Sequence, residues 1–523
     1  MKLNKTILSL IAAVLVLPGC GSDDGETAKN ATPNVNLPII QGSAIGSATL
    51  YSTVPHEFAV EGITRYVKML PRSNASRSSR DMGDEDAIHI IAADDGVNGE
   101  KIRRAVMIMQ HLLTDLPSSS YGANKLSIAQ TMAQRNATLM LTADENASDA
   151  LMTRLFVKEA IKQGQLEAWV TASGASTLAG LDFTSEQAFL RSFDLYSKSQ
   201  DEDDSEAISN SFTQGVFNSA LTPKWLKNSQ GLMYRELTVD GDCHYMSKYA
   251  SYCKYLADNA DRDAAYEEIL HLVQAQGIAP NNNYQVLQAQ IDARALSLYN
   301  DHQAGRPAVW QPESDTWQEW AGDDINSSTI GTTYSHEYFA AAFEAYMGLA
   351  QHNGVGLDGY QALTRDAMQA QDSEAKGWIT QFFHEYVQYT ARIDSNGVET
   401  FHVNQFPASS NPPTFKMNRD DAIRGEEYTY KSQWLLNAKI IGDRSINLTA
   451  NDQDNILEGN QANNTVDGKA GRDSYLVDAN FSECTRAEQT AMGFVVTCPS
   501  IGQDLLINVE TILFKDRKLA ITP

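Results

Sequence analysis

Three residues near the middle of the chain have the types and spacing of a metal site that activates water. Glu267 and His271 are four positions apart, so on a helix both side chains share one face and can reach one cation. Glu268 lies next to that face, where a carboxylate can accept a proton from a polarised water molecule. We therefore expect a helix over about residues 262–276 that presents these three side chains.

The segment from Glu267 to His271 resembles the His-Glu-x-x-His helix of zinc peptidases, with a glutamate at the place of the first histidine. Residues 333–348 contain Glu337, followed by two aromatic residues and a small-residue stretch. This segment resembles the metal-binding glutamate helix of the anthrax lethal factor family. Together the two likenesses imply a zincin-like metallopeptidase domain. In it Glu267, His271 and Glu337 hold Zn²⁺ or another divalent metal, Glu268 is the general base, and a peptide or protein is the substrate.

Glu267 is the departure from the zincin pattern. A carboxylate can bind zinc at about 2.0–2.2 Å, but two carboxylates and one imidazole favour harder cations and make zinc less Lewis-acidic. His244 and His336 are alternative nitrogen ligands, and helical geometry turns His336 about 100° away from its neighbour Glu337, which favours His244. Enzymatic activity stays open, because the same pattern fits a non-catalytic, calcium-binding surface or adhesion-type protein on a peptidase scaffold.

The C-terminal part of the chain contains a nine-residue repeat. Equivalent positions are Asn455, Asn464 and Asp473, then Leu457, Val466 and Tyr475, then Gly459 and Gly468. The repeat resembles the RTX calcium-binding nonapeptide, which implies a parallel β-roll with Ca²⁺ between its turns. Carried over by position, the calcium ligands are Asp454, Asn455, Asn464 and Asp473. Asparagine at two of the three repeat positions lowers the ligand charge.

The first 20 residues predict the cellular compartment. Lys2 and Lys5 precede an apolar run, residues 7–17, which has the size of a signal-peptide core. The following Leu17-Pro18-Gly19-Cys20 resembles the bacterial lipobox and implies cleavage before Cys20 and acylation of its thiol. We expect a lipoprotein of the bacterial cell envelope, membrane-anchored through lipid alone.

The remaining cysteines and the net charge restrict the other partners. The cysteines form two close pairs, Cys243 with Cys253 and Cys484 with Cys498, which predict two short-loop disulfides in an oxidising compartment. The formal net charge of −25 argues against nucleic-acid binding, which needs a cationic surface. The oligomeric state is left open.

The predicted fold class is α+β and multidomain. A mainly helical zincin-like domain follows an α/β region, and a small β-roll ends the chain. Strands are expected at 86–93, 137–142 and within 232–239, an exposed acidic loop at 201–206, and one or two helices within 363–392. The predicted parts are a signal peptide at 1–19, a flexible tether at 20–45, the α/β region at 46–205, the zincin-like domain at 206–400, a linker at 401–440, and the β-roll with its tail at 441–523.

Overall fold

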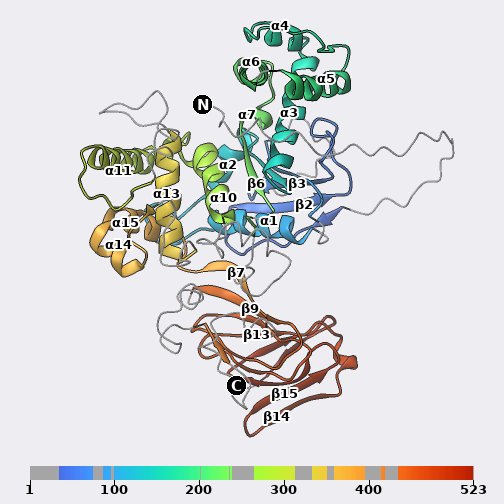
Figure 1. The fold of residues 1–523 in the computed structure, drawn as a ribbon. Helices are drawn as coiled ribbons and strands as arrows, with labels where there is room; N and C mark the ends of the chain where they lie inside the picture. Colours follow the sequence, from blue (N-terminus) through green and yellow to red (C-terminus); the bar gives the residue numbers. More distant parts are fainter. Residues whose placement is uncertain are drawn as a thin grey trace, which may run out of the picture.

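The computed structural model describes most of the chain (Figure 1). The described ranges are 34–74, 86–95, 99–200, 202–234, 236–237, 264–312, 332–349, 359–394, 414–417 and 434–521. Cys20, His244, Cys243 and Cys253 lie outside these ranges. Among the described residues, no helix combines the length and apolar character needed to cross a bilayer.

The N-terminal sheet has six strands in sequential order. The first four pair antiparallel, and β4, β5 and β6 pair parallel. The central strands β4 and β5 are buried along their whole length, as their mainly apolar sequences predict. The strands are β1 (Val35–Asn36), β2 (Ile45–Tyr51), β3 (Arg65–Pro71), β4 (Ile88–Ala92), β5 (Thr138–Thr142) and β6 (Ser229–Met233).

Helices cover both faces of this sheet, because successive side chains of a buried strand point to opposite sides. Leu139 and Leu141 of β5 belong to one apolar cluster, and Met140 belongs to the other. The first cluster includes α1 (Glu100–Leu112) and α2 (Leu126–Gln134). The second includes α3 (Glu145–Lys162), α4 (Leu166–Thr171), α5 (Glu186–Ser199), α6 (Glu202–Asn218) and α7 (Lys224–Lys227).

A second group of helices extends the first cluster beyond the sheet. Figure 1 shows α10 between β6 and α13, with α11, α14 and α15 beside α13. These helices are α10 (Ala265–Val273), α11 (Gln285–Gln303), α13 (Thr332–Met347), α14 (Arg365–Gln371) and α15 (Ser373–Phe382). A single π-helical turn, Gln274–Ile278, continues α10, and a short 3₁₀ turn, Asn282–Tyr284, precedes α11.

Two further six-stranded sheets form the C-terminal part. Their strand orders are β14-β15-β16-β12-β10-β8 and β18-β17-β13-β11-β9-β7. The repeat strands alternate between the sheets, so that Leu448 pairs with Val466 in one and Leu457 pairs with Tyr475 in the other, both parallel. All four side chains are buried and belong to one apolar cluster.

The strands of these two sheets occupy residues from 387 onward. They are β7 (Val387–Asp394), β8 (Thr414–Lys416), β9 (Leu435–Ile441), β10 (Asn447–Thr449), β11 (Ile456–Glu458), β12 (Thr465–Asp467), β13 (Ser474–Leu476), β14 (Arg486–Thr490), β15 (Gly493–Cys498), β16 (Gly502–Ile507), β17 (Thr511–Leu513) and β18 (Lys518–Ala520). The predicted disulfide between Cys484 and Cys498 is present, with an S–S distance of 2.02 Å.

The mixture of helices and three sheets agrees with the predicted α+β architecture, but several local predictions are wrong. Residues 202–206 of the predicted acidic loop begin helix α6 instead, because carboxylates near a helix N-terminus interact favourably with its dipole. Strand β6 joins the N-terminal sheet, although it lies beyond the predicted boundary at 205. Strands β7 and β9 pair with each other, although their residues were predicted as helix and linker.

Candidate metal centre

Helix α10 is the element that positions the predicted ligands, because it is packed on several sides. It contacts α1, β6 and α13. Its apolar residues Ile269, Leu270, Leu272 and Val273 are buried in the core. The two residues at the four-residue spacing, Glu267 and His271, are also buried, with exposed fractions of 6% and 7%. Burying two ionisable groups is costly unless they are paired or bind a metal, so their placement needs a compensating partner.

Helix α13 supplies the third residue, Glu337, and a buried polar network fixes this helix. Asp372, which has an exposed fraction of 1%, accepts hydrogen bonds from the hydroxyl groups of Tyr338 and Tyr360, each at 2.8 Å. The guanidinium of Arg294 donates to the same carboxylate at 3.1 Å. Because Tyr338 follows Glu337 directly, this network holds the ligand-bearing turn of α13 against α11 and α15.

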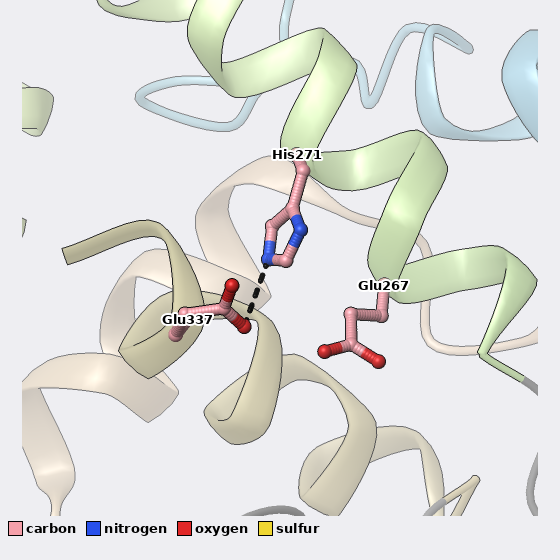
Figure 2. A group of neighbouring side chains, drawn as sticks. All are labelled: Glu267, His271 and Glu337. Atoms are coloured by element: carbon pink, nitrogen blue, oxygen red, sulfur yellow. Dashed lines mark ion pairs between the residues drawn. The ribbon is translucent and has the colours of Figure 1, made fainter. Parts of the chain in front are cut away.

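The side chains of Glu267, His271 and Glu337 converge on one space, as Figure 2 shows. One ligand atom of each residue lies within 4.8 Å of the other two, so the group could hold a metal ion. The Nε2 atom of His271 lies 3.5 Å from Oε2 of Glu337. It is buried and has no hydrogen-bond partner among the described residues. Since metal–ligand bonds with these donors are about 2 Å long, the three residues fit one divalent cation with small side-chain movements.

Glu268 lies on the other side of the imidazole. Its Oε2 is 3.6 Å from Nδ1 of His271 and accepts a hydrogen bond from the Gln230 side chain at 2.6 Å. A carboxylate at the second ring nitrogen orients a metal-binding histidine and makes it a better ligand. This contact with the second ring nitrogen suits a positioning role for Glu268, beside the general-base role that the zincin likeness implies for it.

Several carboxylates determine the protonation of His271. Burial by itself lowers the pKa of its imidazole, but Glu337, Glu268 and Glu344 outweigh that effect and raise the pKa to about 9. In the absence of metal the imidazole therefore carries a proton at neutral pH. A metal ion must displace this proton, so metal binding here releases a proton and weakens as the pH falls.

Two further residues on α13, His336 and Glu344, lie near His271. His336 is buried, its Nε2 has no hydrogen-bond partner among the described residues, and burial followed by the charge of His271 lowers its pKa to about 3. It is therefore a neutral imidazole close to the site, whereas His244, the other alternative nitrogen ligand, lies outside the described residues. Glu344 is fully buried and is not among the site residues predicted from the sequence. Its seven-residue spacing from Glu337, two turns along one helix face, was the signal for it.

The residues predicted to bind calcium lie at the turns of the C-terminal sheets. Asn455, Asn464 and Asp473 are buried, with exposed fractions of 1%, 3% and 1%. Asp454 is exposed and forms an ion pair with Arg472 at 3.3 Å. Of the four predicted calcium ligands, Asn455, Asn464 and Asp473 are therefore buried, whereas Asp454 is exposed.

Comparison with known proteins gives no relative for this arrangement: no family model, curated protein or solved structure matches the chain.

Proposed function

We propose that the protein is a metal-dependent hydrolase that cleaves peptide bonds. The observation that carries the proposal is the convergence of Glu267, His271 and Glu337, with one ligand atom of each within 4.8 Å of the others. Two carboxylates and one neutral imidazole balance the charge of a divalent cation. Their oxygen-rich donor set suits Zn²⁺ and harder ions such as Mn²⁺.

The residues of the chain divide the work between binding and orientation. Glu267 and Glu337 supply the negative charge, and Nε2 of His271 supplies the nitrogen donor. Glu268 holds the opposite ring nitrogen and so fixes the tautomer and the direction of the imidazole. A bound divalent cation would supply Lewis-acid activation of water and of the peptide carbonyl. Glu267 and His271 are buried, which strengthens electrostatic interactions at the centre.

A non-catalytic protein on the same scaffold is the second candidate. The observation that favours it is the raised pKa of His271, about 9, because a protonated imidazole between Glu268 and Glu337 forms ion pairs with both carboxylates without any metal. In that case the three residues form a buried ion-pair cluster that stabilises the contact between α10 and α13.

We also infer that the mature protein is a lipid-anchored component of the bacterial envelope, with peptides or proteins as partners. The support is the sequence around Cys20. The repeat strands alternate between two sheets and pair parallel within each, which supports an RTX-like β-roll at the C-terminus. The order of the α10 and α13 motifs supports a zincin-like helical domain.

Metal content measured by elemental mass spectrometry tests the proposal. The purified chain should contain about one equivalent of zinc or manganese, and Glu337→Gln should lose it, because a neutral amide is a poor ligand for these ions. Glu488→Gln is the matched control, since Glu488 lies on the exposed strand β14 with a side-chain exposure of 58%. Metal that is absent from the wild-type chain, or unchanged in Glu337→Gln, would support the non-catalytic candidate.

A further inference from the structure

The turns of the C-terminal sheets are joined by buried asparagine side chains. Each of four asparagines donates its amide N–H to a backbone carbonyl 16 to 19 positions earlier in the chain. These bonds are Asn451 to Leu435 at 2.8 Å, Asn455 to Leu436 at 3.1 Å, Asn460 to Arg444 at 2.9 Å and Asn464 to Ile446 at 2.7 Å. Since one full coil of the nine-residue repeat spans 18 residues between paired strands, each bond connects a turn to the turn stacked on it.

The chemistry of these bonds differs from that of a calcium site. A backbone carbonyl and an ionised carboxylate are both acceptors, so a cation must lie between them to join two turns. An asparagine amide has donors as well as an acceptor. It can therefore bond the carbonyl of the neighbouring turn directly. In this chain the asparagine N–H groups occupy the carbonyl oxygens of Leu436 and Ile446.

The backbone N–H groups of Asn455 and Asn464 bond to aspartates of the turn stacked on the opposite side, so each stack of linked turns forms a column. The backbone N–H of Asn455 donates to Oδ1 of Asp473 at 2.8 Å, and that of Asn464 donates to Oδ1 of Asp504 at 2.7 Å. Asp504 occupies the place that the repeat would assign to a residue 18 positions after Asn464. The chain reaches this place only after the β14–β15 hairpin, so the nine-residue pattern does not reveal Asp504.

We propose that the side-chain amides of Asn451, Asn455, Asn460 and Asn464 replace calcium as the links between turns, so that residues 434–521 fold without the ion. This assignment departs from the ligand roles that the RTX likeness implies for Asn455 and Asn464. It is independent of the proposed activity of the α10–α13 centre.

Thermal unfolding of the full chain in chelator and in millimolar Ca²⁺ tests the proposal. Glu337→Gln serves as the parent, because it lacks one ligand of the metal centre and any calcium effect then reports the repeat. We expect the same Tm and the same near-ultraviolet circular dichroism in both buffers. A Tm that falls in chelator and recovers with Ca²⁺ would overturn the proposal.

A double substitution, Asn455→Asp with Asn464→Asp in the same parent, tests the same idea in the opposite direction. Two carboxylates cannot donate to the carbonyls of Leu436 and Ile446, so we expect a lower Tm in chelator and a partial recovery with Ca²⁺. Asn437→Asp on strand β9 is the control, because it makes the same chemical change outside the columns. A double variant as stable in chelator as its parent would show that the amides do not link the turns. If the double variant does not fold, the comparison of the Glu337→Gln parent in chelator and in Ca²⁺ decides the question.

Discussion

At the scale of single residues, neighbouring glutamates on one helix have different roles because they face different atoms of His271. Glu267 points into the space that Nε2 and Glu337 share, whereas Glu268 contacts Nδ1 and Gln230. The sequence places both carboxylates near the metal. Only the contacts show that one is a candidate ligand and the other positions the imidazole.

Glu268→Ala tests this division of roles. Removing a carboxylate that orients a histidine ligand typically costs about 10–100-fold in metal affinity, and we expect a loss of that size for zinc or manganese in competition with a chelating dye. Glu268→Gln should retain most of the affinity, because its amide oxygen can still accept a hydrogen bond from Nδ1. A Glu268→Gln chain that binds metal normally but has lost all hydrolysis would instead identify Glu268 as the general base.

At the scale of elements, the centre exists only if α13 keeps its position against α11 and α15. Asp372 controls that contact, since its buried carboxylate accepts from Tyr338, Tyr360 and Arg294. Asp372→Ala leaves these three donors without their acceptor, and we expect the free energy of unfolding to fall by about 3–5 kcal/mol. Urea denaturation followed by circular dichroism measures this change.

Asp366→Ala is the control for Asp372→Ala. Asp366 is exposed in the first turn of α14, where its loss removes only a helix-dipole interaction worth about 0.3–1 kcal/mol. Equal effects of the two substitutions would show that the buried network does not hold α13.

The same elements show how far the sequence predicts the structure. Helix α10 with Glu267 and His271, and Glu337 on α13, are predictable, because helical spacing and two short motifs specify them. The hydrogen-bond network around Asp372 cannot be predicted from local sequence, since its partners Arg294 and Tyr338 are 78 and 34 positions away in the chain. Strand β7 replaces the helix that the sequence predicts, because its sheet partner β9 follows a long way along the chain and this pairing overrides local helical spacing.

At the scale of the whole molecule, buried titratable groups give the two ends of the chain opposite pH dependence. His89 on strand β4 and His111 on α1 are neutral in the fold, because burial, followed by nearby positive charges, lowers both pKa values to about 3. In the unfolded chain both would bind protons below about pH 6.5. Each histidine therefore contributes stability that is lost as the pH falls from about 6.5 toward 3, by about 1.4 kcal/mol per pH unit.

Asp504 in the C-terminal sheets makes the folded state more stable, not less stable, as the pH falls. Burial raises its pKa from 3.8 to about 7, although hydrogen bonds from Tyr475 and Asn464 oppose the change. The folded state thus holds a proton that the unfolded state releases, and its contribution to stability is present below about pH 3.8 and lost as the pH rises toward 7.

Hydrogen exchange measured by mass spectrometry at pH 5.5 and 7.5, corrected for intrinsic exchange rates, tests this opposition. On acidification we expect weaker protection in β4, β5 and α1. We expect stronger protection in β16, which contains Asp504, and in its neighbour β12. Asp504→Asn should abolish the response of β12 and β16 alone, because an amide does not titrate. Protection that changes in the same direction in both regions would contradict the assignment. It would show that the continuous apolar core joining the helices to the C-terminal sheets makes the molecule respond to pH as one cooperative unit.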